Sequence, residues 1–206
     1  MQKDPRFKNR SFNSQSPHAY LSDYAKAVQQ GLASVEPAAL DAASQLLSKV
    51  RQSGGRIFVA GNGGSAAISE HLSCDWQKGV HVHGQANLQV QCLTSNTALL
   101  TAIANDFSYG EAFSFQLELA DLTKKDAVLL ISSSGNSENI VKAAELAKAK
   151  GCPVIGLSGF SGGKLKAAAD ISLHIPCENY GVVEDCHQSI MHILAQYHDL
   201  KNRGEA

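Results

Sequence analysis

One local pattern occurs twice in this chain and constrains its fold more than any other feature. A short apolar run leads into a turn of small residues, and the turn leads into a segment with helical periodicity. The first copy spans residues 56–76, with a glycine-rich turn, and the second spans 127–150, with a serine-rich turn. Short buried strands that alternate with helices imply a parallel sheet covered by helices on both faces. The predicted fold class is therefore α/β.

Further segments extend this alternation. Apolar residues recur at helical intervals from Ala19 to Val50, with a break near Glu36 and Pro37. The other predicted elements are strands at 153–157 and 171–175, an edge-strand alternation at 80–83 and a closing helix at 183–201. We assign residues 1–18 to a polar N-terminal arm and residues 19–206 to a single domain, because one core suits a chain of this length.

Composition excludes several classes of function. The chain has 206 residues, of which 44% are hydrophobic, and its net charge of −1 supplies no basic surface for nucleic acid. Its five cysteines form no CxxC pair, and no signal segment precedes the domain. The apolar runs are far shorter than the roughly 20 residues that cross a bilayer. We expect a cytoplasmic protein with free thiols, no membrane span and no nucleic-acid partner.

The two turns carry groups that suit a phosphate. The first, 61–65, combines three glycines, an amide and a serine, and the second, 132–137, carries four serine hydroxyls and a glycine. Each turn precedes a helix N-terminus, where backbone N–H groups attract anions. Either turn alone is equally compatible with a purely structural strand-to-helix connection, but the two turns together favour a phosphorylated ligand. Neither matches GxGxxG or GxxxxGK[ST], so we expect no nucleotide cofactor.

At this point the residues resemble a known family. The run Gly61-Asn62-Gly63-Gly64-Ser65-Ala66-Ala67, followed by His71, by Asn105-Asp106-Phe107 and by the serines of 132–137, is similar to the sedoheptulose 7-phosphate (phosphoheptose) isomerases of the sugar isomerase (SIS) family. The resemblance covers about residues 19–197. It implies a SIS domain with a flavodoxin-like parallel sheet, assembly into a homotetramer, and active sites at the subunit interfaces.

The resemblance also implies roles for individual residues. The expected substrate contacts are Asn62, Gly63, Gly64, Ser65, Asp106, Ser132, Ser133, Ser134, Ser137 and Glu184. The reaction would convert sedoheptulose 7-phosphate into D-glycero-D-manno-heptose 7-phosphate through an enediol. Such a step needs a carboxylate and a second acid–base group.

Four residues of this chain match positions that carry the family's acid–base and metal chemistry. The expected catalytic residues are Asp75, Glu184 and His192, and some relatives bind zinc at the positions of His71, Asp75, Glu184 and His192. A zinc site and a metal-free site both remain open here. Asp75 replaces a longer glutamate and Glu184 replaces a glutamine. We therefore hypothesise that Glu184 acts as base or ligand where Asp75 falls short.

Helix geometry limits this set. Eight residues of helix rise about 12 Å, so Glu184 and His192 cannot both ligate one ion from one regular helix. Either a second subunit contributes, or the helix begins after Glu184. A further departure is Gly181, where some relatives carry a substrate-contacting aspartate. Two alternatives therefore stay open: an isomerase for another phosphosugar, and a non-catalytic SIS protein that only binds phosphosugars or acts as a scaffold.

Overall fold

The computed structural model describes residue 12 and residues 15–205. Most of the predicted arm at 1–18 therefore lies outside the described residues. The first helix, α1 (Pro17–Ala33), begins two residues earlier than the predicted domain, and the Ser16 side chain caps it by accepting from Ala19 N at 3.1 Å. In the described part of the chain, no helix is both long and apolar enough to span a bilayer.

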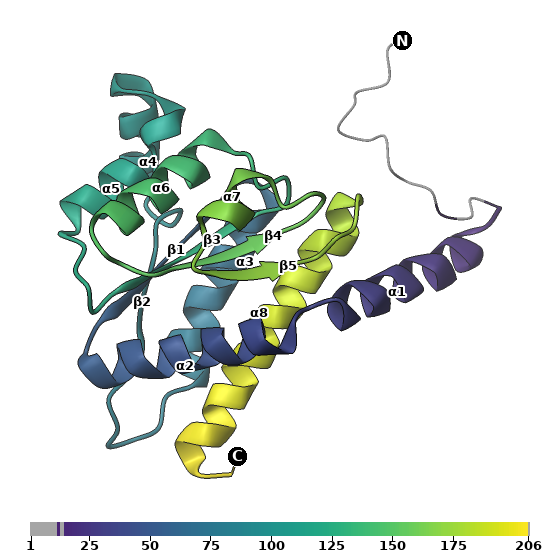
Figure 1. Cartoon of the computed structure of the whole chain (residues 1–206), viewed down its shortest axis with the longest axis horizontal. Coiled ribbons are helices and arrows are strands. Elements are labelled where there is room, and N and C mark those ends of the chain that lie inside the picture. The colour runs from purple at the N-terminus through teal and green to yellow at the C-terminus, as the bar shows by residue number, and fades with distance from the viewer. Residues whose placement is uncertain (1–11, 13–14, 206) are drawn as a thin grey trace.

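The described residues form one parallel sheet of five strands (Figure 1). Its order is β2-β1-β3-β4-β5, which is the flavodoxin-like order. The strands are β1 (Arg56–Gly61), β2 (Gln89–Cys92), β3 (Ala127–Ser132), β4 (Val154–Ser158) and β5 (Ile171–His174). The predicted α/β class is confirmed.

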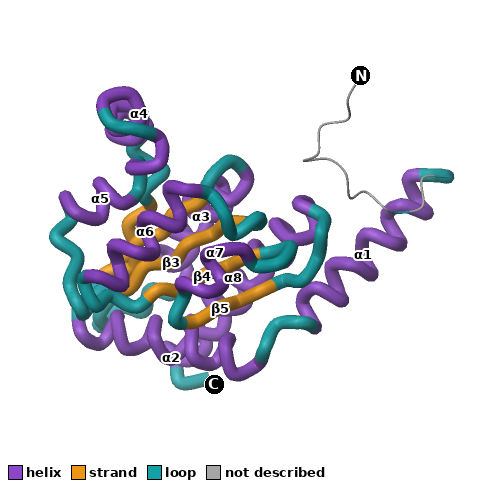
Figure 2. The backbone as a smooth tube through the Cα atoms, turned by 45° about the horizontal axis from the view of Figure 1, so that its top comes forward, coloured by secondary structure: helices purple, strands orange, loops and turns teal. Residues whose placement is uncertain are grey.

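Helices cover both faces of the sheet (Figures 1 and 2). Alternate residues of β1 explain why: Ile57 and Val59 belong to one buried cluster, whereas Phe58 and Ala60 belong to the other. The first cluster includes residues of α2 (Pro37–Ser53), α3 (Gly64–Cys74) and α8 (Tyr180–Arg203). The second includes residues of α5 (Ser114–Leu119), α6 (Glu138–Ala149) and α7 (Gly163–Ala168).

Two parts of the sequence prediction need correction. Residues 80–83 form no strand, because the chain leaves α3 through a π-helical turn, Asp75–Gly79, and continues as a loop. The edge strand is instead β2, which pairs with β1 in the register Arg56 opposite Gln89. Its four residues are too few to give a clear period. The prediction also lacked α4 (Thr97–Asp106), the 3₁₀ turn Tyr109–Glu111, α5 and α7.

The sheet order determines where a ligand can sit. β1 and β3 are neighbours, and their chains leave in opposite directions, β1 toward β2 and β3 toward β4. Open α/β sheets bind ligands at such a switch point, beyond the carboxyl ends of the strands. The glycine-rich turn follows β1 and the serine-rich turn follows β3, so the fold brings the two predicted phosphate-binding turns together.

Candidate functional site

A small cavity of about 170 Å³ lies between these two turns. Most of the predicted substrate contacts line it, together with a tyrosine from the start of α8. The lining residues are Asn62, Ser65, Ile131, Ser132, Ser133, Ser134, Ser137, Tyr180 and Glu184. Gly63 and Gly64 belong to the turn between Asn62 and Ser65. The structure therefore brings nine of the ten predicted contacts to one place.

The serine turn has the geometry of an anion cradle. The hydroxyl oxygens of Ser132 and Ser137 are 3.4 Å apart. Ser137 is the N-cap residue of α6, but its side chain makes no capping hydrogen bond to the helix. Gly135 holds a φ of +67°, and a Cβ there would collide with the carbonyl of Gly162. The glycine is therefore required by both conformation and space. Free N–H groups and hydroxyls at a helix N-terminus favour a phosphate.

Glu184 supplies the carboxylate of this cavity. Its side chain lies over Gly64, where an added Cβ would be 2.6 Å from Oε2. Burial raises the pKa of Glu184, with a smaller contribution from the neighbouring charge of Asp185. A carboxyl group whose pKa moves toward neutrality is suited to accept and return a proton.

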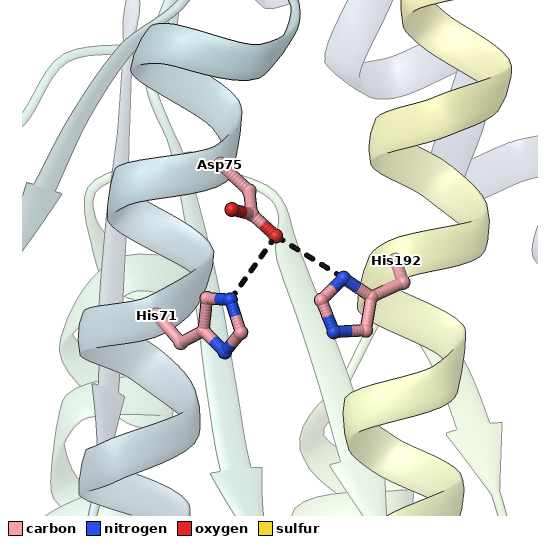
Figure 3. Close-up of side chains that lie close together, drawn as sticks. All are labelled: His71, Asp75 and His192. Atoms are coloured by element: carbon pink, nitrogen blue, oxygen red, sulfur yellow. Dashed lines mark ion pairs between the residues drawn. The ribbon is translucent and has the colours of Figure 1, made fainter.

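A second group of polar side chains lies between α3 and α8 (Figure 3). Asp75 Oδ2 is 3.4 Å from His71 Nε2 and 3.1 Å from His192 Nδ1. Potential ligand atoms of these three residues lie within 4.8 Å of one another. Asp75 is the first residue of the π-helical turn. π-turns occur frequently at functional sites, and Asp75 reaches both histidines despite its short side chain.

Gln188 closes this group into a hydrogen-bonded ring. Its Nε2 is 3.3 Å from His71 Nδ1 and 2.9 Å from His192 Nε2. Gln188 therefore contacts one nitrogen of each ring, and the other two nitrogens, His71 Nε2 and His192 Nδ1, face the carboxylate of Asp75.

The structure does not bring Glu184 into this group within one chain. α8 is continuous from Tyr180, so the alternative in which the helix begins after Glu184 is wrong. Glu184 lines the cavity between the glycine-rich and serine-rich turns, which we call the serine cavity, while His192 lies two helical turns further along α8. The four predicted zinc ligands are therefore divided in each chain into a group of three and a separate carboxylate.

Two other predicted features are explained by their surroundings. Asp106 is exposed at the end of α4 and does not line the cavity, although Asn105 donates to it at 2.9 Å. At Gly181, an added Cβ would be 2.9 Å from the hydroxyl of Tyr24. That hydroxyl donates to Asp185 Oδ2 at 2.6 Å. Tyr24 therefore fills the space that a longer residue at Gly181 would use.

Sequence reasoning missed three polar residues that contact the predicted ones. Gln188 bridges the two histidines, and Asn139 and Tyr109 both bond to Asn62. A signal existed only for Gln188, which precedes His192 by one helical turn and so shares its face. Tyr109 and Asn139 meet Asn62 through tertiary structure alone.

Comparisons with known proteins agree with this geometry. Residues 20–159 match the SIS domain family. A probable phosphoheptose isomerase from Thermoplasma volcanium is 37% identical over 179 residues, which is 87% of this chain and 90% of that protein. A phosphoheptose isomerase from Helicobacter hepaticus is 41% identical over 157 residues, covering 76% of this chain and 79% of its own.

A solved structure supports the same assignment. The phosphoheptose isomerase from Neisseria gonorrhoeae matches this fold with a TM-score of 0.80 and 29% identity, over 88% of this chain and 96% of that one. The fold, the serine-lined cavity at the switch point and these similarities lead to one conclusion: the chain belongs to the SIS domain family, in the group of the phosphoheptose isomerases.

Proposed function

We propose that this protein is an aldose–ketose isomerase that converts sedoheptulose 7-phosphate into D-glycero-D-manno-heptose 7-phosphate. One observation carries the proposal: a half-buried carboxylate, Glu184, faces a serine-lined cavity at the switch point of the sheet. The cavity offers hydroxyls and helix-terminal N–H groups for a phosphate. The phosphoheptose isomerases among the relatives support the choice of sugar.

The chemistry follows from this arrangement. Serines of both turns bind the phosphate and fix the carbon chain of the sugar relative to Glu184. The carboxylate removes a proton from the carbon beside the carbonyl, which gives an enediol. It then donates a proton, which exchanges with solvent while it is on the carboxyl group, to the neighbouring carbon. A histidine such as His192 moves protons between the two oxygens. The raised pKa of Glu184 supports this role, because its protonated form persists closer to neutral pH.

The group of His71, Asp75 and His192 fits a zinc ion, because zinc accepts mixed histidine and carboxylate ligands. When bound there, zinc would polarise an oxygen of the sugar as a Lewis acid. These three residues would hold it, and Gln188 would orient both rings. Glu184 of the same chain is not part of this set.

We propose a cytoplasmic homotetramer in which neighbouring subunits complete each active site. The separation of Glu184 from the histidine group supports this, since a second chain can bring the two closer. Apolar side chains of α8 also support it: Ile193, Tyr197 and Leu200 are 45%, 45% and 42% exposed. Exposed apolar surface of this kind is typical of subunit contacts.

The test is turnover by the purified protein, followed by NMR, with sedoheptulose 7-phosphate and with fructose 6-phosphate as the alternative sugar. We expect an aldoheptose phosphate from the first and little reaction with the second. A preference for fructose 6-phosphate would indicate another phosphosugar isomerase. Binding of both sugars without any product, with or without added zinc, would indicate a protein that only binds phosphosugars.

Zinc is tested separately by metal analysis of the purified protein before and after dialysis against a chelator. We expect about one zinc per chain, and its loss from a variant with alanine at His71 and His192. Retention of stoichiometric zinc in that variant would contradict the assigned site.

A further inference from the structure

Asn62 forms a reciprocal amide pair with Asn139. Asn62 Nδ2 donates to Asn139 Oδ1 at 2.8 Å, and Asn139 Nδ2 donates to Asn62 Oδ1 at 2.9 Å. Asn62 follows β1, whereas Asn139 is in the first turn of α6 and is only 2% exposed. The pair therefore links the glycine turn to the helix that follows the serine turn.

A third residue completes the set of contacts to Asn62. The hydroxyl of Tyr109, from the 3₁₀ turn after α4, donates to Asn62 Oδ1 at 2.7 Å. The side chain of Tyr109 is 54% exposed, so its ring is not part of the core. Asp106, three residues earlier, is the last residue of α4. Tyr109 thus connects that segment to the wall of the serine cavity.

The hydrogen-bonding capacity of an amide shows what Asn62 has left for a ligand. A side-chain amide offers two N–H donors and one oxygen with two lone pairs. Asn139 and Tyr109 occupy both lone pairs of Asn62 Oδ1, and Asn139 accepts from one N–H. One N–H remains, on a residue that lines the cavity. Asn62 can therefore only donate to a ligand there.

We propose that Asn139 and Tyr109 are positioning residues that hold Asn62 as a fixed hydrogen-bond donor to an oxygen of the bound phosphosugar. The inference rests on the proposed function, because it assumes that the serine cavity binds the phosphosugar. It adds a direction to that contact: the oxygen facing Asn62 acts as an acceptor. Neither positioning residue lines the cavity, so both act through Asn62.

A double-mutant cycle between Tyr109 and Asn62 tests this coupling. The variants are Tyr109→Phe, Asn62→Ala and their combination. The affinity for sedoheptulose 7-phosphate is measured by calorimetry and kcat/KM by NMR. Tyr109→Phe removes one hydrogen bond from an exposed side chain, so we expect a three- to tenfold loss in the wild-type background, about the effect of one such bond. In the Asn62→Ala background, we expect no further loss.

Tyr20→Phe is the matched control, since it removes a phenol hydroxyl from α1, away from the cavity lining. An equal loss from Tyr109→Phe in both backgrounds, or no loss in the wild-type background, would overturn the inference.

Asn139→Asp keeps the side-chain volume but replaces the donating N–H by a second oxygen that faces Asn62 Oδ1. We expect it to weaken sugar binding by at least tenfold and to lower the melting temperature, because the new carboxylate is buried. Binding is measured well below the melting temperature of the variant, and unchanged binding would contradict the proposal.

The proposed function can fail independently of this inference. If the wild-type chain binds the sugar without turnover, the cycle is read on affinity alone and the inference is still decided. If the chain does not bind this sugar, inorganic phosphate serves as the probe for the same variants. Binding of neither molecule would overturn the inference together with the assignment of the cavity.

Discussion

Gly64→Ala tests the position of the Glu184 carboxylate without changing any charged or polar group. An added Cβ would be 2.6 Å from Oε2, whereas ordinary van der Waals contact begins near 3.4 Å. The carboxylate must therefore move by about 0.8 Å, and a misplacement of about 1 Å can cost about a hundredfold in rate. Gly64 starts α3 and its φ is not in the left-handed region, so alanine is compatible with the backbone.

We expect kcat to fall by about a hundredfold while the melting temperature stays within a few degrees of the wild type. Gly79→Ala is the matched control, because an added Cβ there meets nothing within 4 Å. A kcat for Gly64→Ala within twofold of the wild type would refute the requirement for Glu184 at this position.

Three further predictions follow from single side chains. Glu184→Gln should lower kcat by about 10²–10⁴-fold, the usual contribution of an acid–base group, and full turnover would refute that role. Asp126→Asn should cost about 1–3 kcal/mol in urea unfolding, because this 2%-exposed carboxylate accepts from Arg56 at 3.0 Å, whereas the Arg56 side chain is 32% exposed and stays solvated. Hydrogen bonds from Arg56 and backbone groups help hold the pKa of Asp126 below its usual value. The stabilisation by this carboxylate is therefore present above about pH 4 and is lost as the pH falls further. If the unfolding free energies of wild type and variant changed equally with pH below about pH 4, this explanation would be contradicted. Gly135→Ala should destabilise the fold by at least about 1–3 kcal/mol from backbone strain, and further through the collision of Cβ with the carbonyl of Gly162. It should also weaken phosphate binding in calorimetry, and unchanged values of both would refute the account of this turn.

The sequence predicted the parts of the fold that depend on local pattern. Four of the five strands, β1, β3, β4 and β5, were predicted correctly, because glycine, serine or proline bounds each of their apolar segments in the sequence. The glycine-rich and serine-rich turns after β1 and β3 were also placed correctly, and phosphate binding by these turns stays a prediction. The strand β2 was missed. It has one buried residue in four, as β5 does, but no proline marks its end in the sequence as Pro176 does for β5. The contacts of Asn139 and Tyr109 with Asn62 depend on tertiary packing beyond the carboxyl ends of the strands. No spacing in the sequence predicts these contacts.

The candidate site shows the same division. Family resemblance named the residues of both groups, but only the structure separated Glu184 from His71, Asp75 and His192. The rise of a helix already predicted that Glu184 and His192 of one chain cannot ligate the same ion. The structure confirms their separation, because α8 is continuous through both residues. The part that could not be predicted is the surroundings of each group, such as the hydroxyl of Tyr109 that donates to the amide oxygen of Asn62.

The central claim is that a protein carboxylate transfers a proton between two sugar carbons through an enediol. The most direct measurement is turnover of sedoheptulose 7-phosphate in D₂O, with the product analysed by NMR at low conversion. The account predicts an aldoheptose 7-phosphate that carries deuterium at C2 with the wild type, and formation of this product about 10²–10⁴-fold more slowly with Glu184→Gln. A product formed over many turnovers without any deuterium on carbon, or an equally active Glu184→Gln variant, would contradict it.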